Sequence, residues 1–211
     1  MGKLIIINGS PRASKSNSKK YAEVFKDHYK GEILEYNIVS KKHETLFEKI
    51  NECSDILFVF PLYVDSIPAV FTDFLKKLEQ YKGDTKPTIH VLINCGFIEP
   101  EQNFVAVEII KFFSKQNGYP FGSTLCIGGG EAIMGTPFAF FAKIKIKKLA
   151  KSINNGKKEF YTVTMPLTKK LYIKASTNYW IKYGERNGNY ENWINYIENI
   201  INVVLKYRII Q

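Results

Sequence analysis

The chain has 211 residues, of which 45% are hydrophobic, and this suffices for the core of one α/β domain with an extension. No apolar run is long enough to span a bilayer, and the strand-like N-terminus lacks a cleavage site, so neither a membrane-spanning protein nor a signal peptide is expected. The net charge of +10 lies almost wholly in residues 142–211, which is more typical of a solvated lysine-rich face than of a nucleic-acid or membrane-binding surface.

The three cysteines, Cys53, Cys95 and Cys126, lie far apart and form no C-x-x-C pair. The sequence therefore offers no ligand set for a zinc ribbon or a cysteine-ligated iron–sulfur cluster, and we predict no metal site. Because no disulfide framework is indicated, we expect a reducing, cytoplasmic compartment.

The first stretch, residues 3–18, reads KLIIINGSPRASKSNS. Its aliphatic run Leu4 to Ile7 predicts a buried strand, and the turn residues 8–11 end that strand. Apolar side chains then recur at helical spacing over residues 21–28. A strand, a polar loop and a helix in this order direct loop N–H groups and a helix N-terminus at one point, which predicts an anion site.

Strands and helices alternate along the chain to about residue 153. Further strands are expected over residues 32–38, 55–60, 88–94 and 123–127. Helices are expected over residues 44–51, 68–80, 103–116 and 140–152, and in the C-terminal stretches 171–183 and 190–207. Several strands are continuously apolar, as in a parallel sheet that is buried on both faces. Right-handed crossovers then give a doubly wound, three-layer α/β sandwich.

Three loops with distinctive sequences follow the carboxyl ends of predicted strands. They span residues 9–18, 61–66 and 95–99. In a doubly wound sheet such loops open on the same edge, and ligands bind there at the topological switch point. We therefore expect the three loops to build one site.

The first loop carries hydroxyls and one arginine, but it matches neither G-x-x-x-x-G-K-[ST] nor G-x-G-x-x-G. Hydroxyl and amide groups donate to phosphate oxygens, and Arg12 can add a charge-assisted bond. A solvated turn capped by Ser16 or Asn17 would explain one of these residues but not the whole set, so the anion site is favoured.

The second loop, PLYVDSIP, is apolar and bracketed by two prolines, so it could lie flat against a planar ring. A packed connection in which Asp65 or Ser66 caps the next helix is equally consistent with this sequence. In the third loop, Gly96 indicates a point where the backbone approaches something closely.

Together, GSPRASKSNS, PLYVDSIPAVFTDFLKKLE and NCGFIEPEQN resemble the flavodoxin-like NAD(P)H-dependent oxidoreductases, the NADPH-dependent FMN reductase and quinone reductase family, over about residues 3–153. The resemblance implies a flavodoxin-like fold, with a five-stranded parallel sheet of order 2-1-3-4-5 and FMN at its edge.

The resemblance also implies that the FMN phosphate is held by Ser10, Arg12, Ser16, Asn17 and Ser18. It implies that the isoalloxazine ring is lined by Pro61, Leu62, Tyr63 and Val64, and that its polar edge meets Asn94, Cys95, Gly96 and Phe97. The third loop departs from the T-x-G-G of many relatives, because Phe97 follows Gly96.

The implied activity is hydride transfer from NADPH or NADH to bound FMN and on to a quinone, a flavin or a similar small-molecule acceptor. This step needs no protein acid or base, so no catalytic residue is nominated. We expect His28 and His43 on helix or loop surfaces and His90 within a strand. Two alternatives stay open: a flavodoxin-like electron carrier without its own NAD(P)H oxidation, and a non-flavin binding protein that uses the basic segment. No nucleic-acid motif supports the second alternative, and neither nucleic acid nor membrane is expected as a partner.

Residues 154–211 are expected to form a helical extension packed on the same domain. The aromatic residues of this segment, Trp180, Tyr183, Trp193 and Tyr196, are scattered among charges. They fit a cap over the core, a dimer contact or a lid on the flavin pocket. The resemblance implies a homodimer.

Overall fold

The computed structural model describes residues 2–40, 43–81, 83 and 85–186. The chain divides into two compact units, Met1–Pro166 and Leu167–Gln211. In the second unit the described element is α6 (Lys169–Arg186), which confirms the helix predicted over residues 171–183. The helix predicted over residues 190–207, with Trp193 and Tyr196, lies outside the described residues. Across the described ranges, no helix combines the length and the apolar character that crossing a bilayer requires.

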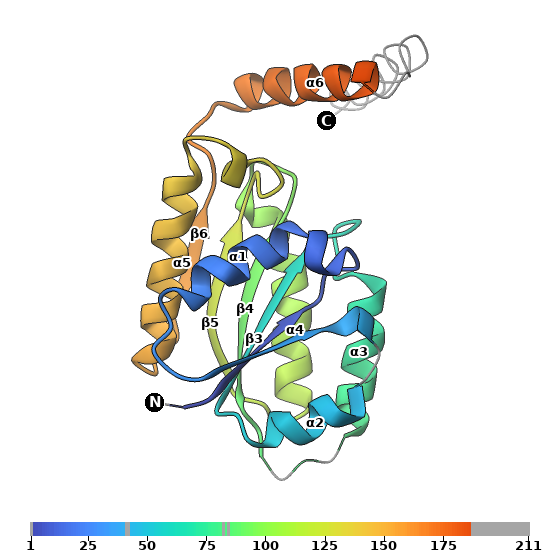
Figure 1. Cartoon of the computed structure of the whole chain (residues 1–211), viewed down its shortest axis with the longest axis vertical. Coiled ribbons are helices and arrows are strands. Elements are labelled where there is room, and N and C mark those ends of the chain that lie inside the picture. Colours follow the sequence, from blue (N-terminus) through green and yellow to red (C-terminus); the bar gives the residue numbers. More distant parts are fainter. Residues whose placement is uncertain (1, 41–42, 82, 84, 187–211) are drawn as a thin grey trace. The chain divides into compact units, whose positions relative to one another are not determined.

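The first unit is built on one parallel sheet whose strands run in the order β2-β1-β3-β4-β5-β6 (Figure 1). The strands are β1 (Leu4–Asn8), β2 (Ile33–Asn37), β3 (Asp55–Pro61), β4 (Thr88–Asn94), β5 (Phe121–Ile127) and β6 (Phe160–Val163). The predicted order 2-1-3-4-5 is confirmed, but the sheet has six strands and not five.

The sixth strand lies in the segment that was predicted to be helical, and that prediction was wrong there. β6 pairs with β5 in parallel, from Thr124 opposite Phe160 to Ile127 opposite Val163. It has four residues and forms an edge of the sheet, so only Val163 is fully buried. A short edge strand has no long apolar run, which is the signal that revealed the central strands.

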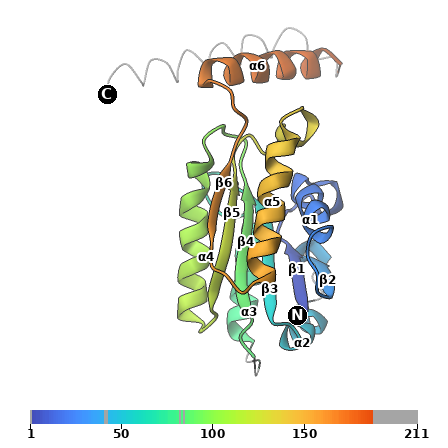
Figure 2. The same ribbon diagram turned by 90° about the vertical axis from the view of Figure 1, so that its left-hand side faces the viewer.

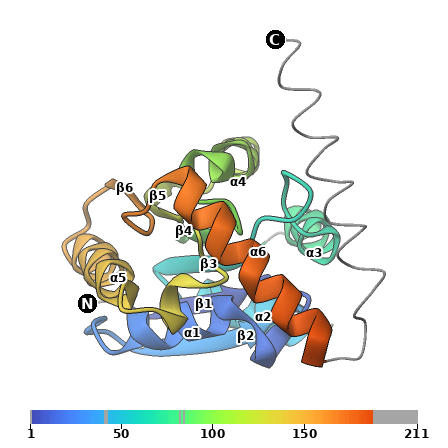
Figure 3. The same ribbon diagram turned by 90° about the horizontal axis from the view of Figure 1, so that it is seen from above.

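Helices cover both faces of the sheet (Figures 2 and 3). They are α1 (Asn17–Lys26), α2 (His43–Asn51), α3 (Ala69–Gln80), α4 (Phe104–Gln116) and α5 (Ala139–Asn154). α1 and α5 pack together on one face, and α2, α3 and α4 cover the other. The three-layer sandwich predicted from the alternation of strands and helices is therefore confirmed.

The central strands supply a core to each layer because alternate side chains point to opposite faces of the sheet. In β1, Ile5 and Ile7 join the core beneath α2, α3 and α4, whereas Leu4 and Ile6 are buried outside that cluster. The register brings the carboxyl ends of neighbouring strands to one edge, since Pro61 pairs with Asn94, and Asn94 pairs with Ile127. The loops that follow these residues must therefore meet.

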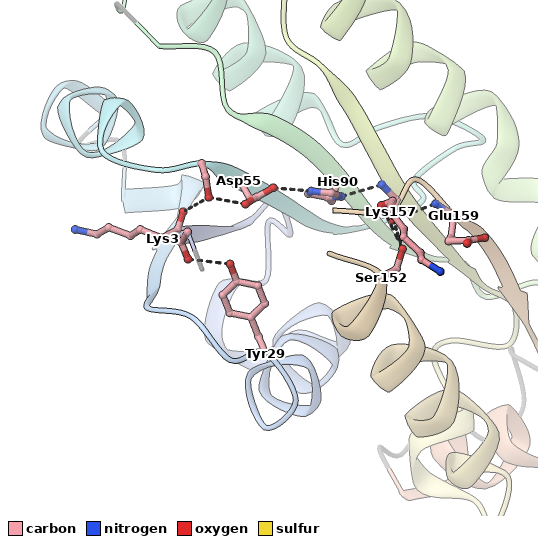
Figure 4. Close-up of polar contacts among 10 residues, drawn as sticks. Lys3, Tyr29, Asp55, His90, Ser152, Lys157 and Glu159 are labelled. Carbon is pink, nitrogen blue, oxygen red and sulfur yellow. Dashed lines mark hydrogen bonds and ion pairs between the residues drawn. The ribbon is translucent and has the colours of Figure 1, made fainter. Parts of the chain in front are cut away.

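A polar network ties the strands together near the opposite, amino-terminal edge (Figure 4). His90 of β4 is buried, accepts a hydrogen bond at Nδ1 from the Ser123 N–H (2.8 Å) and approaches Asp55 Oδ1 of β3 through Nε2 (3.0 Å). Since a backbone N–H can only donate, Nε2 carries the ring proton and donates it to Asp55. His90 thus has a structural role, as expected from its place in a strand.

His43 differs from its prediction as a surface residue. It begins α2 but is buried, with its ring edge-on to Phe74 and Nδ1 2.8 Å from the Tyr36 hydroxyl. Burial, together with the positive charge of Lys77, lowers the pKa of this histidine. It belongs to the core between α2 and α3 and does not line the pocket formed by the three loops.

Candidate functional site

A pocket opens at the carboxyl edge of the sheet, where the three predicted loops meet. It contains about 510 Å³ of empty space, and this volume includes open solvent at its mouth. Its lining residues are Ser10, Arg12, Ser16, Asn17, Ser18, Pro61, Leu62, Tyr63, Asn94, Cys95, Gly96 and Glu131. The structure thus brings together every predicted site residue except Val64 and Phe97.

The first loop is shaped by Asn8, the last residue of β1. Its Oδ1 accepts from the Ser10 N–H (3.0 Å), and its Nδ2 donates to the Ala13 carbonyl (3.2 Å) and to Ser16 Oγ (3.4 Å). A buried asparagine can serve as donor and acceptor at once, so a single side chain holds both ends of the turn. Asn8 does not line the pocket, but it positions the residues that do.

Ser16 is the N-cap of α1. Its Oγ accepts from the Lys19 N–H (3.1 Å) and donates to the Ala13 carbonyl (2.6 Å). The capping role considered for Ser16 is therefore present. It coexists with a place in the pocket wall, and the first N–H groups of α1, which have no partner within a helix, begin at the lining residues Asn17 and Ser18.

Asn94, the last residue of β4, links the three loops. Its Nδ2 donates to the Phe60 carbonyl (3.2 Å) and to Ser18 Oγ (3.4 Å), and its carbonyl accepts from the Leu62 N–H (2.7 Å). The side chain is buried, so these bonds are shielded from water. Asn94 therefore fixes the first turn of α1 against the exit of β3.

The second loop contains a tight turn with an unusual backbone. Tyr63 and Ser66 exchange backbone hydrogen bonds (2.9 and 3.0 Å) around Val64 (φ +47°) and Asp65 (φ +55°). Positive φ at both central residues defines a type I′ turn, which favours Asn-Gly and is strained for a β-branched residue. Val64 is 99% exposed at the tip, so the structure places it away from the pocket wall, whereas Tyr63 lines the pocket.

Backbone strain in the described part of the chain is confined to the loops of this edge. The only non-glycine residues with positive φ there are Ala13, Val64 and Asp65. Strained conformations cost about 1–3 kcal/mol each and cluster at ligand clamps and active sites. Their placement supports a functional site independently of the residue types.

The third loop leaves open space at Gly96. A Cβ built there would meet only Glu131 Oε2, at 3.9 Å, so the protein itself does not require a glycine. By contrast, a Cβ at Gly130 would lie 2.7 Å from the Cβ of Asn94, and this glycine is needed for packing. The close approach expected at Gly96 is not made by the protein itself and stays a prediction. Phe97 is half-exposed and lies outside the pocket wall.

Cys95 and Tyr21 are held in their neutral forms by the packing around the pocket. Burial raises the pKa of the Cys95 thiol to about 11, so this cysteine is not a thiolate near neutral pH. Burial also raises the pKa of Tyr21, whose hydroxyl donates to the Gly130 carbonyl (2.5 Å). Neither residue is suited to exchange a proton at neutral pH.

Glu131 is the lining residue that the sequence did not reveal. It follows the glycine run 128–130 at the end of β5, and its carbonyl accepts from Asn17 Nδ2 (3.3 Å). Glu131 is exposed and its carboxylate lies beside Gly96, so the pocket carries the negative charge of Glu131 as well as the positive charge of Arg12. The one available signal was its position after a strand end, because no motif marks it.

Within the described residues, no group of three or more His, Cys, Asp or Glu side chains is placed to hold a metal ion. The pocket instead combines a polar wall around α1, an apolar wall at residues 61–63 and a glycine-bordered edge at residues 94–96. This arrangement suits an elongated ligand that has an anionic end and a flat apolar body.

Comparison with known proteins finds similar structures but no match in sequence. No family model matches the chain, and no curated protein matches it in sequence. A solved azoreductase from Bacillus anthracis is similar at 16% identity and a TM-score of 0.55, over 74% of this chain and 100% of that one. An NAD(P)H:quinone oxidoreductase from Methanothermobacter marburgensis is similar at 13% identity and a TM-score of 0.55, over 72% of this chain and 96% of that one.

A third similar structure is an FMN-dependent NADH-azoreductase from Bacillus anthracis, solved in complex with FMN. It shares 15% identity and a TM-score of 0.55 with this chain, over 72% of this chain and 100% of that one. At such identities the likeness establishes the fold alone. The chain has a flavodoxin-like fold, as the resemblance of its motifs implied, with one additional strand at the edge of the sheet.

Proposed function

We propose that the chain binds FMN at the carboxyl edge of its sheet and oxidises NADPH or NADH, passing the electrons to a quinone, a flavin or a similar small molecule. The observation that carries the proposal is that the polar first loop and the apolar second loop face each other across Asn94 and Gly96 in the same pocket. The similar structures include enzymes named as azoreductases and quinone reductases, which is consistent with this class of reaction.

The first loop fits the phosphate of FMN. Arg12 supplies a positive charge, Ser10 and Ser18 supply hydroxyls, and α1 begins at Asn17 with its N–H groups and the positive end of its dipole. Ser16 contributes through the cap that fixes this turn, because its hydroxyl hydrogen is already donated to Ala13.

The second and third loops fit the isoalloxazine ring. Pro61 and Leu62 offer an apolar surface, Tyr63 adds an aromatic ring, and Gly96 leaves room for the backbone to meet the polar edge of a flat ligand. Micromolar binding requires about 8 kcal/mol. A few charge-assisted hydrogen bonds at about 1.5–3 kcal/mol each supply part of this, and burial of the ring against the second loop supplies the rest.

FMN, when bound, would supply the redox chemistry between the nicotinamide and the acceptor. The protein residues then have the tasks of binding and orientation. Leu62 and Pro61 would exclude water from the ring, while the bonds of Asn94 to Ser18 and Leu62 hold the first loop against the second. No residue of the pocket is required as an acid or base for the hydride step, in keeping with the neutral Cys95 and Tyr21.

The decisive test is the absorption spectrum of the protein after incubation with FMN and gel filtration, followed by anaerobic mixing with NADPH or NADH. Retained flavin that is bleached by the nicotinamide, and is reoxidised by a quinone, is the expected result. Retained flavin that is not bleached would favour the electron carrier. A colourless protein that takes up no FMN would overturn the proposal.

A further inference from the structure

The outward face of α5 exposes a group of apolar side chains near its N-terminal end. Phe140 and Phe141 are 60% and 41% exposed, and Ile144 is exposed one turn further along the helix. The two phenylalanine rings contact each other edge to face at a centroid distance of 5.3 Å. The inward face of α5 is buried through Ile146 and Leu149 and packs on β5 (Figure 2). The helix thus packs on the sheet with one apolar side and exposes a second one.

Lysines continue this outward face towards the C-terminal end of α5. Lys147, Lys148 and Lys151 are exposed and lie one to two turns beyond Ile144, at the spacing that keeps side chains on one side of a helix. None of the three forms an ion pair within the part of the chain that the structure describes. Residues 132–158 contain seven lysines and no acidic residue. We call the following six residues the α5 face: Phe140, Phe141, Ile144, Lys147, Lys148 and Lys151.

The neighbouring helix does not neutralise these lysines. α1 packs beside α5 on the same face of the sheet and carries three lysines and one glutamate (Figure 3). The glutamate, Glu23, already lies close to Lys19 (3.9 Å) and Lys26 (2.7 Å) of its own helix. The two helices of this layer therefore carry eight lysines against one glutamate, and such a surface attracts anions.

The side chains of the α5 face fit an anionic lipid surface better than other anionic partners. All its basic residues are lysines, whereas protein interfaces are enriched in arginine and depleted in lysine. Its two phenylalanines are adjacent and lie about 16 Å along the helix from Lys151, whereas binding of single-stranded nucleic acid uses aromatic side chains that stack successive bases. Helices that lie on membranes combine aromatic side chains, which enter the headgroup region, with lysines that stay at the anionic headgroups.

We propose that the α5 face attaches the chain to the surface of an anionic lipid bilayer, with its apolar end among the headgroups and its lysines at the lipid phosphates. Composition alone favoured a solvated lysine-rich face, because a sequence does not show which side chains the fold leaves exposed. No residue of the α5 face lines the pocket, so attachment does not depend on flavin binding. α5 begins at Ala139, shortly after the pocket residue Glu131, so the apolar end of the face lies at the same edge of the sheet as the pocket.

The first experiment measures binding of the full chain to lipid vesicles by flotation in a density gradient. The chain is expected to float with vesicles of about three parts phosphatidylcholine to one part phosphatidylserine, and this binding is expected to weaken as salt is added, because salt screens the lysines. Vesicles of phosphatidylcholine alone are expected to bind much less of the chain.

Substitutions separate the apolar and the basic contributions to vesicle binding. Phe140→Ala is expected to weaken it about tenfold, because an aromatic side chain no longer enters the bilayer. The double substitution Lys147→Gln and Lys151→Gln is expected to weaken it about tenfold or more, since each lysine near an anionic surface contributes about fivefold. The matched controls lie on α4, on the other face of the sheet. Phe112→Ala alters a ring that is 64% exposed, Lys115→Gln removes an exposed charge, and both are expected to bind vesicles like the natural chain.

The second experiment tests whether the apolar end enters the bilayer. A tryptophan placed at the α5 face is compared with one placed on α4, in Phe140→Trp and Phe112→Trp, and the natural chain gives the signal of Trp180 and Trp193. Bromine atoms on the lipid chains quench tryptophans that lie within the bilayer. Vesicles of the same phosphatidylserine content with brominated phosphatidylcholine are expected to quench the added tryptophan of Phe140→Trp and not that of Phe112→Trp.

Three outcomes would overturn the proposal. The first is a full chain that does not float with phosphatidylserine vesicles. The second is binding that depends on the lysines while Phe140→Ala has no effect and Phe140→Trp is not quenched, as expected of a surface that binds a polyanion such as RNA through charge alone. The third is binding that the α4 controls weaken as much as the α5 substitutions do. Circular dichroism of each variant shows that a loss of binding is not a loss of folding.

Discussion

Arg12 is the residue on which the proposed phosphate contact depends most. Its guanidinium is the positive charge in the wall of the pocket, on the loop that leads into α1. We expect Arg12→Ala to weaken FMN binding about tenfold or more, because a charge-assisted hydrogen bond is lost. The dissociation constant can be measured by titrating FMN fluorescence. The matched control is Lys49→Ala, which removes an exposed charge on α2 outside the pocket.

A substitution at Glu131 is expected to change the FMN affinity in the direction opposite to Arg12→Ala, and the same titration measures both. Its carboxylate shares the pocket with a ligand that carries a phosphate, so Glu131→Gln is expected to tighten FMN binding about two- to fivefold, which corresponds to about 0.5–1 kcal/mol for an exposed charge. If both Arg12→Ala and Glu131→Gln left the affinity unchanged, the phosphate would not lie in this pocket. Two changes of opposite sign cannot both arise from a loss of folding.

At the level of single residues, the sequence predicted the pocket residues that belong to a motif. It did not predict the residues whose role depends on where the fold places them. Ser10, Asn17 and Asn94 are recognisable from their types and spacing. Asn8 reads only as a turn residue, although it holds the first loop together through three hydrogen bonds. Val64 belongs to the motif of the second loop, but the direction of its side chain depends on a turn geometry that residue types alone do not define.

Among the elements, the strained turn at residues 63–66 allows a prediction about stability. A positive φ costs a β-branched residue about 1–2 kcal/mol, and glycine adopts it without strain. Glycine also adds about 0.5–1 kcal/mol of conformational freedom to the unfolded chain. Val64→Gly is therefore expected to raise the free energy of unfolding by about 0.5–1 kcal/mol. Urea denaturation followed by circular dichroism measures this change.

Val39→Gly is the control for this prediction, because the same substitution is made at an exposed valine without a positive φ. Loss of chain stiffness and loss of a partly buried side chain both act there, so the free energy of unfolding is expected to fall by about 0.5–1 kcal/mol or more. If Val64→Gly lowered the free energy of unfolding as Val39→Gly does, the turn would not be strained. A stabilised Val64→Gly chain with weaker flavin binding would show that the strain serves the site.

The central strands and the α-helices described in the first unit could be predicted because their buried faces appear in the sequence as apolar runs and helical periodicity. β6 could not, because Phe160 to Val163 has only one fully buried residue and follows two lysines and a glutamate. Its pairing is a tertiary effect: the Thr124 N–H donates to the Glu159 carbonyl and the Gly128 N–H donates to the Val163 carbonyl, both at 2.8 Å. The residue types of this segment favour a strand, but a run of four residues with one buried side chain is too short to stand out in the sequence.

At the scale of the whole sheet, the edge formed by the carboxyl ends of the strands and the edge formed by their amino ends have different roles. The carboxyl edge carries strained turns and the pocket, whereas the amino-terminal edge is closed by the Asp55–His90 network (Figure 4). Ser123 extends this network, since its Oγ donates to the Lys157 carbonyl (2.8 Å) and accepts from the Glu159 N–H (3.1 Å). Bonds through β3, β4, β5 and the start of β6 thus hold the sheet on the side away from the pocket.

Asp55 makes this network sensitive to acid. Burial alone raises the pKa of its carboxyl, but hydrogen bonds from His90 and Ser54 outweigh burial and hold the pKa below its ordinary value. A carboxyl with a lower pKa in the folded state binds fewer protons there, so its contribution to stability is complete above about pH 4. As the pH falls through the folded pKa, the contribution disappears.

Asp55→Asn removes the charge and keeps an acceptor for His90. At pH 7 we expect the free energy of unfolding to fall by about 1 kcal/mol, which is the difference between a charge-assisted and a neutral hydrogen bond. The gap between the natural chain and the variant should shrink as the pH is lowered from 5 towards 3, because the natural carboxylate is then protonated as well. Urea denaturation at each pH measures the gap, with the exposed Asp73→Asn on α3 as a control that shows no such change.

A gap that stays constant or widens in acid would mean that Asp55 does not hold the network as a carboxylate. The sheet would then owe its cohesion at this edge to the uncharged bonds of His90 and Ser123.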